Sequence, residues 1–207
     1  MIYVTGSPRS GTTFVMELCH GLGDRLHYWY DEAWRGGHED GEFNTLAKNL
    51  GEWLLFPLFS DAAATAREGV LLAPSRRVEP TAIREVLERC WSDYDALKDV
   101  YVGHTLAVAC ELGLRPEAVV LCVRDPEEII GKYGLPSVPL PARLRVPMHL
   151  YAVTGLVVTT CLHYDLPCRT AHFPRFVQEP GYAWSCLGGL HGENETDFRF
   201  AWELAKR

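Results

Sequence analysis

The first part of the sequence runs from a strand into a glycine-containing loop and then into a helix, and this order constrains the fold strongly. Residues 2–5, IYVT, are rich in residues that favour strands, and the loop GSPRSGTT follows at residues 6–13. A helix is expected over residues 10–22, where apolar residues recur at helical spacing: Phe14, Val15, Leu18 and Leu22. A strand that turns into a helix through such a loop is typical of α/β folds that bind phosphate groups.

Strand and helix patterns continue to alternate along the chain. The sequence predicts helices at residues 44–59, 80–97 and 150–162, although GLVVTT in the last one also has strand character. Further strands are expected at residues 26–30, 100–103, 118–123 and 168–173. The continuous apolar run AVVLCV is typical of a strand buried on both faces. Strands separated by helices predict a mainly parallel sheet.

We therefore expect an α/β fold, a three-layer sandwich with a P-loop-like phosphate-binding loop after the first strand. No repeat or linker divides residues 1–207, which predicts a single domain. The proline-rich residues 136–147 are expected to form a stiff loop within it. In parallel sheets, ligands bind where the carboxyl ends of the strands meet, so the functional residues should lie at that edge.

Composition limits the classes of partner and the compartment. The formal net charge of −7 argues against a general nucleic-acid-binding protein, which would present a basic face. The seven cysteines form no CxxC pair, and no Cys/His cluster has finger or deaminase spacing, so we expect reduced thiols and no metal site. No signal peptide is visible, and the apolar run 150–162 is too short to span a bilayer. These features predict a cytoplasmic protein without a membrane span.

The loop has the skeleton of a phosphate cradle but lacks its usual cation. Backbone N–H groups and hydroxyls are offered by six of its residues: Gly6, Ser7, Ser10, Gly11, Thr12 and Thr13. A nucleoside triphosphatase would have lysine where this chain has Thr12. The nearby cation is Arg9, inside the loop. The loop therefore indicates phosphate chemistry different from that of a magnesium-dependent triphosphatase.

The segment TGSPRSGTT resembles the 5′-phosphosulfate loop of sulfotransferases, which use 3′-phosphoadenosine 5′-phosphosulfate (PAPS). The segment VVLCVRDPEEI resembles their second signature, which binds the 3′-phosphate, and CRTAHFPRFVQEPGYAWSCLGGL is loosely similar to a later segment. These similarities follow in order from about residue 2 to about residue 190. The resemblance implies a sulfotransferase that binds PAPS without a metal.

The resemblance also implies roles for individual residues. Arg9 would stabilise charge on the leaving phosphate, and the other loop residues would hold the non-bridging oxygens. Arg124 would bind the 3′-phosphate, although pairing with Asp125 or a helix terminus is an alternative. Lys132 stands where the family usually has serine, either as a phosphate ligand or as a solvated surface lysine. The basic C-terminal segment of some members is absent here.

A hydroxyl acceptor needs a general base because an alcohol is a poor nucleophile until its proton leaves. Glu32 stands where many relatives have a catalytic glutamate, and Asp31 and His38 are its neighbours. His104 falls near the position of a lysine that many relatives have at the end of a strand. Alternatively, Glu32 is only a loop carboxylate without a catalytic role, and His104 is a histidine packed at the end of a strand.

The predicted function is transfer of the sulfuryl group of PAPS to a hydroxyl or amine of a small molecule, sugar or peptide. Two alternatives stay open at this point. One is a P-loop kinase that uses ATP, against which the missing lysine at Thr12 counts. The other is a non-catalytic relative that binds a nucleotide or a partner. Magnesium dependence distinguishes the kinase from the sulfotransferase.

Overall fold

The computed structural model describes residues 1–6, 10–26, 30–31, 36–37, 40–47, 80–99, 104–132 and 140–206. Within these ranges, the backbone but not the side chains is described at residues 30–31, 36–37, 80, 104, 130–132 and 140–149.

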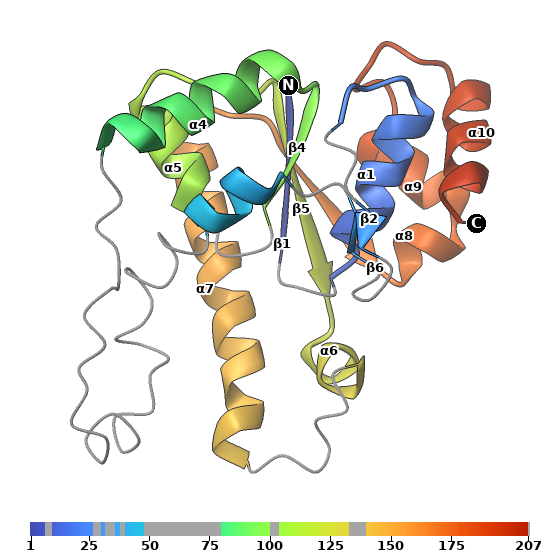
Figure 1. The fold of residues 1–207 in the computed structure, drawn as a ribbon. Helices are drawn as coiled ribbons and strands as arrows, with labels where there is room; N and C mark the ends of the chain where they lie inside the picture. Colours follow the sequence, from blue (N-terminus) through green and yellow to red (C-terminus); the bar gives the residue numbers. More distant parts are fainter. Residues whose placement is uncertain are drawn as a thin grey trace.

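A parallel sheet forms the centre of the described structure (Figure 1). Its strands are β1 (Ile2–Gly6), β4 (Ala96–Asp99), β5 (Ala118–Arg124) and β6 (Cys168–Phe173). They lie in the order β4-β1-β5-β6, and all neighbouring pairs are parallel. β1 is thus covered by a strand on each side, and the carboxyl ends of the strands meet at the lower edge of the sheet in Figure 1.

Helices surround this sheet. Their bounds are α1 (Thr12–Gly21), α4 (Pro80–Asp93), α5 (His104–Glu111), α6 (Pro126–Lys132), α7 (Leu140–Tyr164), α8 (Arg175–Gln178), α9 (Pro180–Leu187) and α10 (Glu195–Ala205), and residues 41–47 are also helical. Figure 1 shows α1, α8, α9 and α10 grouped beside β6, with α4, α5 and α7 beyond β1 on the other side.

Two hydrophobic cores lie against the two faces of the sheet, because successive strand residues point to opposite faces. Val4 of β1 belongs to the core that contains Phe198 and Trp202 of α10. Tyr3, the residue before it, belongs to the core that contains Leu106 of α5 and Val157 of α7. The sheet is therefore packed with helices on both faces, and the predicted α/β fold with a parallel sheet is confirmed.

Several predicted elements are confirmed. The strand predicted at residues 168–173 coincides with β6, and the one predicted at residues 118–123 is β5, which is one residue longer. The strand at residues 2–5 is β1, and the helix predicted over residues 10–22 is α1. Residues 41–47 are helical, which confirms the helix predicted at residues 44–59 over residues 44–47 alone, since residues 48–59 lie outside the described part.

The end predicted for the helix at residues 80–97 was wrong. The structure ends α4 at Asp93 and forms β4 at Ala96–Asp99, so Leu97 is a strand residue and not the end of the helical stripe. The predicted strand at residues 100–103 lies outside the described residues. ALKD is a short stretch with two charged residues, and burial in the sheet rather than local propensity makes it a strand.

Two further expectations need correction. Of the strand predicted at residues 26–30, Leu26 is not in a strand, residues 27–29 lie outside the described part, and Tyr30 begins the two-residue strand β2 (Tyr30–Asp31), which pairs antiparallel with β3 (Gly36–Gly37) and not with the main sheet. Of the loop predicted at residues 136–147, residues 136–139 lie outside the described part. Residues 140–147 belong to α7, which begins at Leu140. Helix was the right choice for residues 150–162. None of the described helices combines the length and the apolar character needed to cross a bilayer.

Candidate functional site

The turn from β1 into α1 is built around two glycines. A Cβ atom on Gly6 would lie 2.4 Å from the carbonyl oxygen of Cys122 and 2.5 Å from Ser10 Oγ. Gly11 has φ of 108°, and a Cβ on it would lie 2.5 Å from the ring of Phe173. Both contacts are too close for a real side chain, and the left-handed conformation of Gly11 also favours glycine. The two glycines therefore let the turn pack tightly between β5 and β6.

This turn leaves polar groups without partners. Ser10 Oγ and Thr5 Oγ1 are buried, and neither has a hydrogen-bond partner among the described residues. Among the described residues, no side chain caps the N-terminus of α1 at Gly11, and the first N–H groups of a helix have no acceptor within the helix. Buried polar groups are normally hydrogen-bonded. An anion bound at the start of α1 would supply the missing hydrogen-bond acceptors. Helix N-termini commonly bind anions such as phosphate.

A buried lysine provides positive charge at this turn. Lys98 of β4 is 2% exposed, and its Nζ donates a hydrogen bond to Thr13 Oγ1 over 3.1 Å. The register pairs Lys98 with Val4, so its side chain extends over the face of the sheet that α1 covers. The neighbouring strand therefore places a buried amine beside the first turn of α1. Sequence reasoning missed Lys98 because its strand was placed at residues 100–103.

The next residue of β4 points to the other face and is already engaged. Asp99 is buried and accepts hydrogen bonds from the hydroxyls of Tyr3 and Thr105. Burial, together with the charge of Asp99, raises the pKa of Tyr3 well above its ordinary value, so the phenol stays protonated. This arrangement ties β4, β1 and α5 together. Asp99 is therefore a structural carboxylate in the described structure and is not aimed at the turn before α1.

Arg124 ends β5 at the same edge of the sheet. Its side chain is 13% exposed, and its Nε donates to Glu128 Oε2 over 2.8 Å, one turn along in α6. Of the expected alternatives, this pair with the first turn of α6 corresponds to the helix terminus, while Asp125 Oδ1 accepts from the backbone N–H of Glu127. A guanidinium has four further N–H donors on its two terminal nitrogens. Arg124 thus lies at the carboxyl edge of the sheet, with terminal N–H groups in addition to the Nε that pairs with Glu128.

The remaining predicted site residues are only partly placed. Arg9, Ser7, Glu32 and His38 lie outside the described residues. His104 is the first residue of α5, so it begins a helix rather than ends a strand, and its side chain is not described. Asp31 lies in β2 and Lys132 ends α6, each placed by its backbone alone. Of the predicted site residues, the structure brings together Gly6 and residues 10–13 at the turn before α1. Lys98, which was not predicted, lies beside them.

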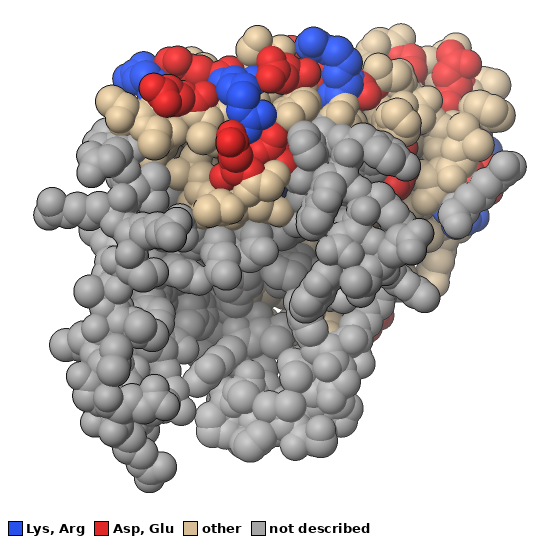
Figure 2. Space-filling model, viewed as in Figure 1, with Lys and Arg blue, Asp and Glu red and all other residues tan. Residues whose placement is uncertain are grey.

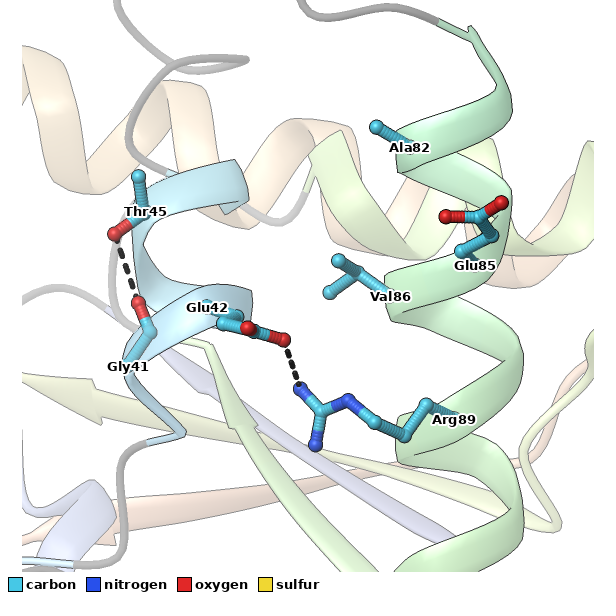
Figure 3. Close-up of a pocket in the computed structure, with 7 residues that line it drawn as sticks. All are labelled: Gly41, Glu42, Thr45, Ala82, Glu85, Val86 and Arg89. Carbon is cyan, nitrogen blue, oxygen red and sulfur yellow. Dashed lines mark hydrogen bonds and ion pairs between the residues drawn. The ribbon is translucent and has the colours of Figure 1, made fainter.

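A separate hollow of about 520 Å³ lies between the helix at 41–47 and α4 (Figure 3). Its cation, Arg89, is paired with Glu42 over 3.1 Å and with Asp40 over 2.9 Å. None of the residues that line this hollow was predicted as a site residue. Since the positive charge of Arg89 is already matched by two carboxylates, the described residues that line the hollow offer no free cation for an anionic ligand.

The described surface in Figure 2 shows acidic and basic side chains interspersed along its upper part. A single-sign charged patch does not appear among the described residues on this face. Comparison with known proteins adds no assignment: no protein-family model matches the chain, and no curated protein is significantly similar to it. The geometry of the turn and the sequence motifs therefore carry the functional argument.

Proposed function

We propose that this protein is a PAPS-dependent sulfotransferase that transfers the sulfuryl group to a hydroxyl or amine acceptor. The observation that carries the proposal is the buried Lys98 amine at the first turn of α1, beside a glycine turn with an unpartnered serine hydroxyl. This combination suits a bound phosphate group. The choice of PAPS among nucleotides rests on the resemblance of the loop and of VVLCVRDPEEI to sulfotransferase motifs.

The residues at the turn fit the 5′-phosphosulfate end of PAPS. Ser10 Oγ is a buried donor without an acceptor among the described residues, and the first N–H groups of a helix have no acceptor within the helix. Gly6 and Gly11 let the backbone of the turn pack where a Cβ atom would not fit. We propose that Gly6, Ser7 and residues 9–13 form this cradle. Arg124 is proposed to hold the 3′-phosphate, with Lys132 beside it. The finer architecture that we propose is a three-layer sandwich with this P-loop-like turn after its first strand.

When bound, PAPS supplies the sulfuryl group that is transferred. The protein's task is then to stabilise the negative charge that grows on the phosphate as the group leaves, which preorganised donors do well in a water-poor site. We assign this task to Lys98 and Arg9. Lys98 is held in place by burial and by its bond to Thr13, so it needs little reorganisation. Glu32 is proposed to accept the acceptor's proton, with His104 as the rival base.

A kinase that uses ATP is the main competing function, since Lys98 also suits a triphosphate. Magnesium in such enzymes is held partly by a carboxylate at the end of a strand near the loop. Asp99 occupies the corresponding strand next to β1, but it is bonded to Tyr3 and Thr105 on the opposite face. This engagement favours the metal-independent reaction over the kinase.

Calorimetry with 3′-phosphoadenosine 5′-phosphate, the desulfated product, tests the proposal. We expect it to bind without magnesium, more tightly than ATP in the presence of magnesium, and more tightly than AMP. Equal affinity for AMP would show that the 3′-phosphate is not recognised. Binding of ATP alone, and only with magnesium, would indicate a kinase instead.

Arg124→Ala supplies a sharper version of this test. Breaking a charge-assisted contact typically costs about 2–4 kcal/mol, so affinity for the bisphosphate should fall while affinity for AMP stays unchanged. Arg199→Ala is a control because Arg199 also pairs with a glutamate four residues away, Glu195, within α10, which the proposed site does not include. An equal loss in the two variants, or none in either, would mean that Arg124 does not bind the 3′-phosphate.

A further inference from the structure

The C-terminal end of α1 places two metal-ligand types side by side. Gly23 has φ of 102°, and its N–H donates to His20 O over 3.0 Å while the N–H of Asp24 donates to Cys19 O over 3.1 Å. These two bonds form a Schellman motif, which folds the residue after the glycine back over the last turn of the helix. The two positions that meet in this motif usually make an apolar contact. Here they are Cys19 and Asp24.

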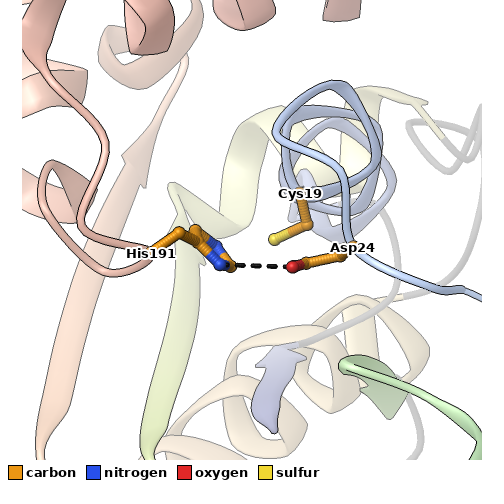
Figure 4. A group of neighbouring side chains, drawn as sticks. All are labelled: Cys19, Asp24 and His191. Atoms are coloured by element: carbon orange, nitrogen blue, oxygen red, sulfur yellow. Dashed lines mark ion pairs between the residues drawn. The ribbon is translucent and has the colours of Figure 1, made fainter.

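A third ligand type comes from a distant part of the sequence. His191 lies in the turn between α9 and α10, and its Nδ1 is 3.2 Å from Asp24 Oδ1 (Figure 4). Glu193 holds this turn by accepting from the N–H groups of Gly189, over 2.9 Å, and His191, over 2.8 Å. The position of the His191 backbone is therefore fixed by hydrogen bonds that do not involve its imidazole.

The carboxylate of Asp24 is not satisfied by this arrangement. Its side chain is 9% exposed, and Oδ2 is buried with no hydrogen-bond partner among the described residues. Cys19 is 3% exposed and lies in the same cluster. Ligand atoms of Cys19, Asp24 and His191 all lie within 4.8 Å of one another. A simple ion pair between Asp24 and His191 accounts for one carboxylate oxygen but leaves the other buried and unpaired.

We propose that Cys19 Sγ, a carboxylate oxygen of Asp24 and an imidazole nitrogen of His191 bind one Zn²⁺ ion. Sulfur, nitrogen and carboxylate oxygen are the donors that zinc takes in proteins, at about 2.0–2.3 Å. Tetrahedral bonds of this length put ligand atoms roughly 3.3–3.8 Å apart, so a contraction of about 1 Å closes the site. Binding releases the thiol proton of Cys19 to solvent. Three protein ligands leave a fourth position for water.

This zinc site is distinct from the proposed phosphate site. Cys19 lies seven residues beyond Thr12 in α1, which corresponds to about 10 Å along the helix axis. The ion would join the end of α1 to the turn before α10, and α1 already packs against α10 itself through Gly21 and Ala201. Zinc is thus expected to stabilise the fold and to leave nucleotide affinity unchanged. Cysteine spacing did not predict the site because its ligands are distant in sequence.

Titration of the full-length protein with Co²⁺ tests this proposal directly. A thiolate bound to Co²⁺ gives a ligand-to-metal charge-transfer band, and Zn²⁺ should remove that band at one equivalent per chain. Zinc in hundredfold excess over its dissociation constant should also raise the melting temperature by roughly 5–10 °C. Absence of both the band and the shift in the wild-type protein would overturn the proposal.

Substitutions then locate the ion. His191→Gln, Asp24→Asn and Cys19→Ser should each weaken zinc binding by more than about 100-fold, since even an outer-shell partner is worth roughly 10–100-fold. His20→Gln, next to Cys19 in α1, and Cys168→Ser, an exposed thiol, are controls that should bind zinc normally. His191→Gln and Asp24→Asn keep the test valid if Cys19→Ser does not fold. A normal cobalt band in folded His191→Gln and Asp24→Asn would place the metal elsewhere and refute the site.

Discussion

Lys98 combines burial with charge, and its substitution should affect stability and binding differently. Desolvation of a buried ammonium opposes folding, whereas its hydrogen bond to Thr13 favours folding, so the two contributions partly cancel. Lys98→Met should therefore change the free energy of unfolding little. The same change removes a charge-assisted contact to phosphate, so affinity for 3′-phosphoadenosine 5′-phosphate should fall by about 2–4 kcal/mol. Chemical denaturation and calorimetry measure the two effects.

Lys206→Met is the control for this substitution. Lys206 lies at the end of α10, with its Nζ 4.1 Å from the centre of the Trp202 ring, and the proposed site does not include it. Its replacement should leave nucleotide affinity as in the wild type. Unchanged affinity in Lys98→Met itself would show that phosphate does not bind at the first turn of α1.

A variant of the proposed base should lose turnover, whereas variants of the phosphate ligands should lose cofactor affinity, and this difference distinguishes the two roles. Glu32 is assigned to the acceptor's proton and to no part of PAPS. Glu32→Gln should therefore keep cofactor affinity while turnover falls by roughly 10²–10⁴, the range for general-base catalysis. The measurement is release of 3′-phosphoadenosine 5′-phosphate from PAPS with a panel of hydroxyl and amine acceptors.

His104→Ala is the comparison for Glu32→Gln. Near-normal turnover in Glu32→Gln together with lost turnover in His104→Ala would move the base to the start of α5. A wild-type rate no greater than the rate without protein, for every acceptor tested, would favour the non-catalytic alternative.

Residues of the candidate site differ in how far sequence reveals them. Gly6, Ser10 and Gly11 are contiguous with a strand and a helix, so their role as a turn follows from local pattern. Lys98 is separated from Thr13 by 85 positions, and only the pairing of β4 with β1 brings them together. Long-range register of this kind depends on the whole sheet, which no local pattern of charge or hydropathy contains.

At the scale of elements, the helix at residues 41–47 is joined to α4 by a buried carboxylate. Asp40 is 4% exposed and accepts from Arg89 at both oxygens over 2.9 Å. Burial alone would raise the pKa of Asp40, but hydrogen bonds from Arg89, the Phe43 N–H and Tyr94 outweigh it and lower the pKa to about 2. A carboxylate with a lowered pKa stabilises the fold when it is ionised.

This carboxylate predicts a loss of stability in acid. Asp40 should contribute about 2 kcal/mol to the free energy of unfolding above pH ~4, and the contribution should disappear as the pH falls from about 4 to about 2. The difference in free energy of unfolding between the wild type and Asp40→Asn, measured by urea denaturation across this range, should shrink accordingly. Comparison with Asp40→Asn separates this effect from that of other carboxylates.

Glu42→Gln is the control for Asp40. Glu42 also contacts Arg89, over 3.1 Å, but its side chain is 73% exposed, and exposed ion pairs contribute about 0–1 kcal/mol. Its replacement should change stability little at any pH. A pH-independent difference between the wild type and Asp40→Asn would contradict the assignment of the lowered pKa.

The elements that sequence predicted well are those whose local pattern agrees with their burial. β5 is apolar throughout its first six residues, and β6 is bounded by Pro167 and Pro174. β4 lacks both signals: its four residues include Lys98 and Asp99, whose charges find partners only after the sheet has formed. Pro141 misled in the other direction, because a proline near a helix start is compatible with helix. Pro147 lies inside α7, where proline is locally unfavourable, so its local signal also pointed away from helix.

At the scale of the whole molecule, the sheet separates two hydrophobic cores but shares its strands between them. Phe198 of α10 is fully buried on the α1 side, and Leu106 of α5 is fully buried on the α7 side. Tyr3 and Val4 are adjacent in β1 and belong to different cores. Loss of packing on one side therefore weakens strands on which the other side also depends.

This sharing predicts that residues 1–207 unfold as one cooperative domain. Phe198→Ala should cost about 3–5 kcal/mol and Leu106→Ala about 2–5 kcal/mol. Each should lower one common melting temperature by roughly 4–20 °C. Melting followed by tryptophan fluorescence and by far-ultraviolet circular dichroism should give coincident curves in the wild type and in both variants. Two transitions, of which Phe198→Ala moves one and Leu106→Ala the other, would mean that the two sides of the sheet fold as separate units.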